Sequence, residues 1–139
     1  MGMFGALDIS ASGLRAQRTN LDVIAGNITN MFTTRGVNGE PFRRRIAVFA
    51  EGNPAMGKEG AGVHIQQIAR DPSPFRMEFD PSHADAMQSG PHKGYVRYPN
   101  VDLSTEMVNA MAATRAYEAN VTVMEITKSM GAAALRLIA

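Results

Sequence analysis

Apolar residues recur at helical spacing near both ends of the chain, and the residues that disfavour helices lie between these ends. The first stretch repeats every seven residues and has two further apolar residues at intervening positions. Such a repeat is typical of a helix that packs along a seam against another helix. We therefore predict an N-terminal helix whose seam consists of Leu7, Leu14, Leu21, Ile24, Ile28 and Met31.

Two glycines, Gly13 and Gly26, interrupt this predicted helix. Each costs a helix about 1 kcal/mol relative to alanine, so the helix needs packing partners to form. Either the glycines let another backbone approach closely or they are merely tolerated. We expect the helix to end within residues 30–36, where short polar side chains compete for backbone hydrogen bonds and Gly36 allows a left-handed turn.

The C-terminal stretch from Leu103 onward contains no proline and a single glycine. Its apolar residues keep a spacing of three and four, which predicts one long helix of roughly 54 Å. Asp102 or Ser104 is expected to cap its start. The predicted row is Leu103, Met107, Ala110, Thr114, Tyr117, Val121, Met124, Lys128, Gly131, Leu135 and Ile138, widened by Val108, Met111 and Ala112.

The two predicted helices differ in length by about ten residues or more, so the shorter helix cannot cover the longer one. We expect the uncovered part of the C-terminal row to pack against other subunits. A self-contained adaptor, in which the terminal helices pair only within the chain, is the alternative. The residues expected at the subunit interface are Leu7, Leu14, Leu21, Ile24, Ile28, Leu103, Met107, Met111, Tyr117, Val121, Met124 and Leu135.

The middle of the chain holds all seven prolines and has a different periodicity. Four short runs with β-type alternation predict strands near residues 43–49, 63–65, 75–79 and 95–98. Glycine-rich and proline-rich stretches separate them. Residues 52–62 are predicted to form a loop, and residues 80–94, which lack any apolar period, are predicted to be a mobile loop.

Together these patterns predict an α+β fold. Long N- and C-terminal α-helices pair in a coiled-coil-like assembly, and a small β-rich, loop-rich middle region is inserted between them. We place the boundaries at residues 1–36 for the N-terminal helix and its motif, 37–100 for the β-rich region, and 101–139 for the C-terminal helix.

Composition removes several classes of function. The chain has 139 residues, a formal net charge of +1 and no cysteine, which excludes disulfides, thiol catalysis and thiolate metal sites. The near-neutral charge argues against nucleic acid as a partner. No apolar run reaches the ~18 residues needed to span a membrane. The N-terminus lacks a basic start and a continuous apolar core, so we expect no cleaved signal peptide.

Candidate chemistry is sparse. Asp80, His83, Asp85 and His92 carry ligand types that suit zinc or manganese, but their spacing matches no metal motif, and solvated loop residues explain them better. The nucleophile and phosphate-loop motifs are absent from the sequence. The three arginines at 43–45 enter a predicted strand, where successive side chains alternate and cannot grip one phosphate together. We expect no metal, no cofactor and no enzyme activity; a hydrolase using the 80–92 loop is the enzymatic alternative.

Two longer motifs resemble a known family. LDVIAGNITNMFTTRG, at residues 21–36, is similar to the N-terminal motif of the bacterial flagellar rod and hook proteins, and YPNVDLSTEMVNAMAATRAYEANV, at residues 98–121, is similar to their C-terminal motif. The short length, the DPSP turn at 71–74 and GYVRYPNV at 94–101 resemble the short rod members. Gly26 and Thr29 depart from the usual pattern.

The resemblance implies a structural role. Members of this family stack helically into the hollow periplasmic rod that carries torque from the motor to the hook, with the terminal helices forming an inner tube. The implied partners are other copies of the chain and other rod proteins, proximal and distal. The resemblance also implies export through the flagellar type III apparatus, without a cleaved signal peptide, to the basal body.

Overall fold

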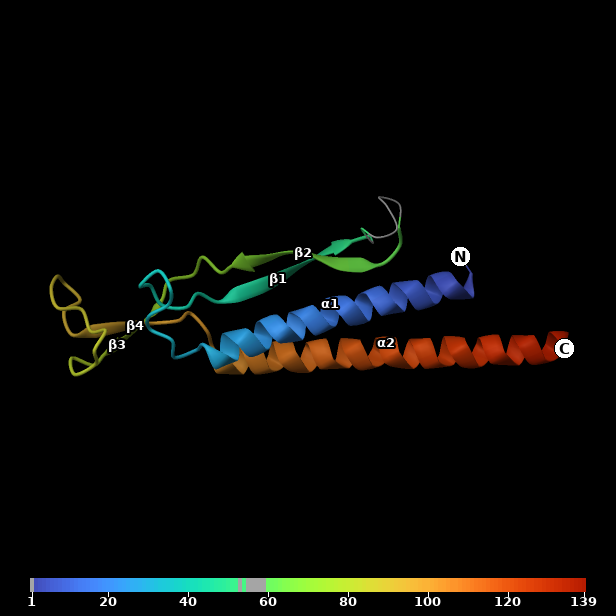
Figure 1. Cartoon of the computed structure of the whole chain (residues 1–139). Coiled ribbons are helices and arrows are strands. Elements are labelled where there is room, and N and C mark those ends of the chain that lie inside the picture. Colours follow the sequence, from blue (N-terminus) through green and yellow to red (C-terminus); the bar gives the residue numbers. More distant parts are fainter. Residues whose placement is uncertain (1, 53, 55–59) are drawn as a thin grey trace.

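The computed structural model describes residues 2–52, 54 and 60–139. Two long helices lie side by side and antiparallel, and a β-hairpin runs along the N-terminal helix (Figure 1). A second two-stranded sheet lies beyond the end of the helix pair where α1 stops and α2 begins. The elements are α1 Met3–Thr29, β1 Arg45–Glu51, β2 Val63–Arg70, β3 Arg76–Phe79, β4 Tyr95–Tyr98 and α2 Leu103–Ile138. The predicted α+β fold is confirmed.

The N-terminal helix α1 has 27 residues and ends where the sequence predicts. Asn30 caps it: its backbone N–H donates to the Gly26 carbonyl, and the N–H of Met31, the next residue, donates to the Ile28 carbonyl. The Asn30 side chain also donates to the Gly26 carbonyl at 2.9 Å. The backbone and the side chain of Asn30 thus both bond the Gly26 carbonyl, in the last turn of the helix.

The C-terminal helix α2 has 36 residues, the full length that the sequence predicts. Asp102 is its N-cap, and its carboxylate accepts hydrogen bonds from the backbone N–H of Thr105 at 3.0 Å and from the Thr105 hydroxyl at 2.7 Å. These hydrogen bonds hold the pKa of Asp102 below its ordinary value. The cap fixes the point at which the chain leaves the β-rich middle and becomes helical.

The middle region contains two separate two-stranded antiparallel sheets, β1–β2 and β3–β4. In the first, Arg45 pairs with Arg70 and Glu51 pairs with Val63, and a bulge lies between Val48 and Phe49. All four predicted strands are confirmed. Because a two-stranded sheet is marginal alone, the first sheet gains stability from α1, which contacts both of its strands.

The two loops of the middle region differ from each other. Gly52 donates its backbone N–H to Gly62 at 2.9 Å and closes the base of the first loop. The rest of the predicted 52–62 loop lies largely outside the described residues. Residues 80–94 contain neither helix nor strand, as predicted, and their predicted mobility stays a prediction.

Backbone hydrogen bonds organise the 80–94 segment. Asp80 donates its N–H to Gly94, Gly94 to Met87, and Met87 to Tyr95, all at 2.9–3.0 Å. The Asp85 carboxylate accepts a hydrogen bond from the Thr34 hydroxyl at 2.7 Å and pairs with Arg35 at 2.6 Å. The segment is therefore tied to the turn that follows α1. Hydrophobic periodicity cannot report such polar and backbone contacts.

Small and polar residues dominate the buried positions of the two helices. On α1 the buried residues include Ser10, Ser12, Gly13 and Asn27, and on α2 they are Glu106, Ala113 and Gly131. The predicted apolar rows are therefore not the most deeply buried faces. Of these rows, only Ile24 and Gly131 are buried in the single chain, because small residues, which periodicity overlooks, allow the helices to approach.

Candidate functional site

The antiparallel register of α1 and α2 is defined by three close approaches along their length. A Cβ atom built on Gly13 would lie 2.8 Å from the Asn120 amide nitrogen, and one on Gly131 would collide with the Met3 side chain. At the other end, Asn27 donates to Glu106. By contrast, nothing lies within 4 Å of a Cβ on Gly26. Close approach thus explains Gly13, whereas Gly26 is tolerated.

The predicted α1 interface residues lie at the edge of the helix pair. Ile24 is buried, whereas the rest of the set is half-buried. These half-buried residues are Leu7, Leu14, Leu21 and Ile28. They have apolar surface available for another chain, in addition to what they bury within their own.

The predicted α2 interface residues are mostly exposed in the single chain. Val121 and Met124 are half-buried. The exposed members are Leu103, Met107, Met111, Tyr117 and Leu135. Their role at a subunit interface stays a prediction, and their exposure leaves them available for it.

A second exposed apolar row on α2 was largely missed. Ile126 and Met130 are 54% and 67% exposed, and Leu137 is 89% exposed. With Val108 and Val123 these residues keep helical spacing, so they lie on one side of α2. The same three-and-four spacing that predicted the first row was available in the sequence for this one. We define the exposed α2 surface as both rows: Leu103, Met107, Val108, Met111, Tyr117, Val123, Ile126, Met130, Leu135, Leu137 and Ile138.

The last two turns of α2 extend past the start of α1 (Figure 1). Because Gly131 lies opposite Met3 at the beginning of α1, the residues that follow Gly131 have no α1 segment beside them. Leu137 and Ile138 are both more than 80% exposed there. The overhang adds to the apolar surface that the single chain leaves uncovered.

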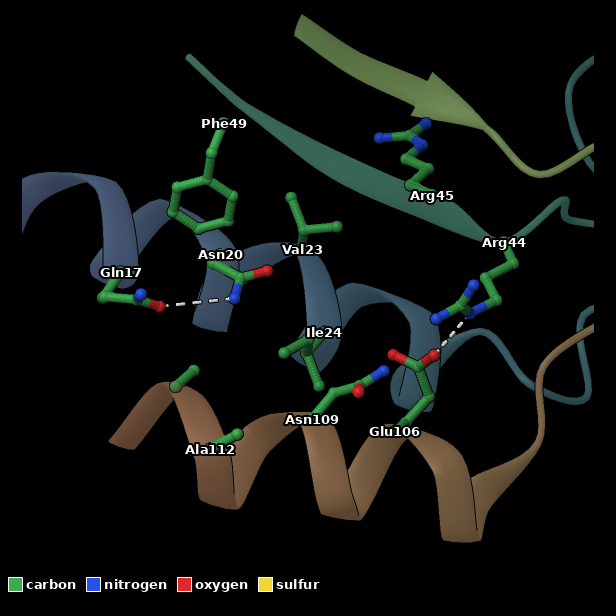
Figure 2. A pocket seen from close by; sticks show the side chains of 11 residues that line it. Gln17, Asn20, Val23, Ile24, Arg44, Arg45, Phe49, Glu106, Asn109 and Ala112 are labelled. Carbon is green, nitrogen blue, oxygen red and sulfur yellow. Dashed lines mark hydrogen bonds and ion pairs between the residues drawn. The ribbon is translucent and has the colours of Figure 1, made fainter. Parts of the chain in front are cut away.

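Beneath this surface, a polar junction joins both helices to the start of the hairpin. Glu106 of α2 is fully buried, and its carboxylate accepts hydrogen bonds from Asn27 of α1 at 3.1 Å and from the Arg44 guanidinium at 2.5 Å. Arg44 also pairs with Asp71 at 3.1 Å. The junction borders a cavity of about 300 Å³, and Figure 2 shows the Arg44 and Glu106 side chains meeting at one end of it.

Asn27 connects α1 to the first residue of β1. Its side-chain oxygen accepts from the Arg45 backbone N–H at 2.9 Å, and its side-chain nitrogen donates to the Arg45 carbonyl at 2.8 Å. The carboxamide therefore bonds both backbone groups of one strand residue, as a neighbouring strand would. Asn27 lies within the N-terminal motif, and these hydrogen bonds explain why an asparagine is needed at this position.

Electrostatics favour the ionised forms of Arg44 and Asp71. Burial lowers the pKa of Arg44, but hydrogen bonds and charge attraction from Glu106 and Asp71 outweigh burial and raise it overall. Hydrogen bonds donated by Ser73, together with Arg44, hold the pKa of Asp71 below its ordinary value. The three arginines point differently, as expected: Arg43 stacks over Phe75, Arg44 is half-buried and pairs with Glu106, and Arg45 is exposed.

The residues considered for a metal site make local contacts instead. The Asp80 carboxylate accepts from the Ser82 hydroxyl at 2.6 Å, and His83 accepts from the Asp85 backbone N–H at 3.0 Å. His92 packs edge-on against Tyr95. Within the described residues no three histidine, aspartate or glutamate side chains are grouped to hold a metal ion.

No helix in the described part of the chain is long and apolar enough to cross a membrane.

Both ends of the chain match family models of known proteins, and the two models describe the same class of protein. Residues 7–35 match the family described as "Flagella basal body rod protein", and residues 92–137 match "Flagellar basal body rod FlgEFG protein C-terminal". The two matched segments contain most of α1 and α2. They define the class as flagellar basal-body rod proteins.

Curated relatives identify the family more closely. The chain is 41% identical to the flagellar basal-body rod protein FlgC of Borreliella burgdorferi and 42% identical to that of Bacillus subtilis, with 99% of each chain covered. It is 36% identical to FlgC of Salmonella typhimurium, covering 94% of this chain and 93% of the relative. The chain belongs to the FlgC family of flagellar basal-body rod proteins.

Proposed function

We propose that the chain is a structural subunit of the flagellar basal-body rod that polymerises helically through its two terminal helices. The observation that carries this proposal is the exposed α2 surface, where large apolar side chains lie uncovered along the length of a 36-residue helix. Monomeric proteins rarely leave extended apolar surfaces in water. Burial against neighbouring subunits would contribute about 25 cal/mol per Å² of apolar surface.

The arrangement of this surface favours an open polymer. The exposed α2 surface and the half-buried leucines of α1 are different patches, so one copy can offer one patch to the other patch of the next. Such heterologous contacts build helices when the rotation does not close. The resulting hollow shaft would transmit torque from the motor to the hook because each subunit is held at several places along two long helices.

We further propose the partners and the location that this role requires. Other copies of the chain and other proximal and distal rod proteins would cover the exposed α2 surface. The chain would reach the periplasmic rod through the flagellar type III export apparatus, without a cleaved signal peptide. Its α1 helix, with two internal glycines and a largely small and polar buried face, suits a chain that passes through an export channel unfolded.

The alternative is a self-contained adaptor whose terminal helices pair only with each other. In such a protein the α1–α2 contact would cover most of the apolar surface of α2. The exposure of Met107, Ile126 and Met130 argues against it, since each is more than half exposed with α1 in place. Likewise, we propose no enzymatic role, because the candidate loop residues are engaged in structural contacts: Asp80 with Ser82, Asp85 with Thr34 and Arg35, and His92 with Tyr95.

A charge placed on the exposed α2 surface tests the proposal. Ile126→Asp should leave the isolated chain folded, because the side chain is exposed, but should abolish incorporation into basal bodies and swimming. Ser89→Asp, in an exposed part of the 80–94 segment, is the matched control and should assemble normally. Helicity of both purified variants is measured by circular dichroism. Normal swimming of the Ile126→Asp strain would show that this surface does not take part in assembly.

A further inference from the structure

Glu106 is a fully buried carboxylate that the proposed rod function does not use. Its two oxygens are bonded by residues from two other parts of the chain: Oε1 accepts from Arg44 at 2.5 Å, and Oε2 accepts from Asn27 at 3.1 Å. In the described part of the chain, Arg44 is the one cation within ion-pair distance of Glu106. The helix pair therefore buries a negative charge whose neutralising partner belongs to neither helix.

That dependence has an energetic consequence. A buried charge without its partner is strongly unfavourable, whereas the paired charge is close to neutral in its net effect. When Arg44 is absent from the junction, packing α1 over Glu106 leaves an unpaired carboxylate buried between the two helices. Closure is favourable only when the segment that precedes β1 has docked.

The position of Arg44 depends in turn on the folded middle region. Its guanidinium pairs with Asp71, which follows β2, and its backbone N–H donates to the Asn100 side chain at 2.8 Å. Asn100 also donates to the carbonyl groups of Asp71 and Ser73. Both strands of the hairpin and the segment leading into α2 must therefore be in place before Arg44 can reach Glu106.

We propose that Glu106 is a positioning residue that makes in-register pairing of the two terminal helices conditional on folding of the middle region. The apolar rows of α1 and α2 repeat along the helices, so by themselves they permit several registers. A buried polar group with one set of partners selects one of them, which is the best-attested use of such groups. Arg44 and Asn27 are the partners that define the register.

A disulfide formed within the full-length chain tests the proposal, since the natural chain has no cysteine. Cysteines replace Gly13 and Asn120, because a Cβ atom at residue 13 would lie 3.1 Å from Asn120 Cγ. The measured quantity is the rate of intrachain disulfide formation in dilute monomer. Arg44→Met should slow it about tenfold or more by leaving Glu106 unpaired. Arg44→Met combined with Glu106→Met should restore it.

Two matched controls accompany these variants. Arg43→Met removes the neighbouring arginine, which bonds the carbonyl groups of Asp71 and Ser73 but does not touch Glu106, and should leave the rate near that of the parent. Glu118→Met removes an exposed carboxylate from the same helix and should also have little effect. Equal rates for Arg44→Met and Arg43→Met would overturn the proposal, as would a double variant as slow as Arg44→Met. No disulfide in the parent chain would also overturn it.

A separate experiment tests whether pairing of the two helices depends on folding of the middle region. Asn100→Ala removes the amide that holds Arg44 and should slow disulfide formation in the parent chain. In the Arg44→Met, Glu106→Met background, the same change should have no effect, because closure no longer needs Arg44. Equal slowing in both backgrounds would show that Glu106 imposes no condition. These rates are measured on single chains, so their outcome does not depend on whether the chain is incorporated into rods.

Discussion

Asn27, near the end of α1, and Glu106, in the first turn of α2, are joined by a hydrogen bond of 3.1 Å although 79 positions separate them in the sequence. Both residues are almost completely buried. Their contact holds the end of one terminal helix against the start of the other, directly beside the first strand of the hairpin. The orientation of the β-rich region relative to the helix pair follows from this junction.

The two glycines of α1 should respond oppositely to substitution. Gly13→Val should lower the free energy of unfolding by about 1–3 kcal/mol, because the new side chain would displace Asn120 from its bond to Ala116. Gly26→Ala should raise it by about 1 kcal/mol, since a methyl group there meets no neighbour and favours the helix. Urea unfolding followed by circular dichroism measures both. A destabilising Gly26→Ala would contradict the open environment described for Gly26.

Stability should fall in acid. Hydrogen bonds from Ser73 and Thr34, followed by the nearby arginines, hold the pKa values of Asp71 and Asp85 below the ordinary value of 3.8. Groups with depressed folded pKa values stabilise the fold above their unfolded pKa, and this stabilisation is lost as the pH falls through the folded pKa. The thermal midpoint of the chain should therefore be nearly constant from neutral pH down to about 5 and should drop below about pH 4.

Asp85→Asn provides the control for this acid dependence. The variant cannot titrate at residue 85, so its thermal midpoint should be lower than that of the parent near neutral pH and should change less between about pH 5 and about pH 3. Parallel curves for the parent and the variant would show that the contacts of Asp85 with Thr34 and Arg35 contribute nothing to the acid dependence.

The histidines of the 80–94 segment should be dispensable. His83→Ala and His92→Ala should leave swimming unchanged, because their contacts are local packing against Tyr98 and Tyr95 and a single backbone hydrogen bond. Chelators should likewise leave the thermal midpoint of the purified chain unchanged. A loss of motility that added zinc or manganese restored would instead establish a metal site there.

Much of this fold could be predicted because its signals are local. The absence of proline after Leu103 and the Asp102 cap define α2, and alternation in residues 75–79 and 95–98 defines β3 and β4. The exposure of the last turns of α2 followed from the difference in helix length, whereas most of the second exposed row was missed. These features depend on periodicity and capping, which a single sequence contains.

The junction could not be predicted because its signals are not local. Glu106 lies in the first turn of a helix, where an acidic residue is expected on the surface to interact with the helix dipole. Nothing in the sequence shows which of three successive arginines turns inward. The buried face of α1 is formed by residues such as Ser10, Gly13 and Asn27, which an apolar periodicity does not count.

The most direct test of the assembly proposal is site-specific photo-cross-linking in intact basal bodies. A photoreactive phenylalanine analogue replaces Ile126 on the exposed α2 surface, and the same analogue at Ser89 serves as the reference position. Irradiation is predicted to join residue 126 to a second copy of the chain or to another rod protein, identified by mass spectrometry. An assembled rod in which residue 126 captures no protein, while residue 89 does, would contradict assembly through the terminal helices.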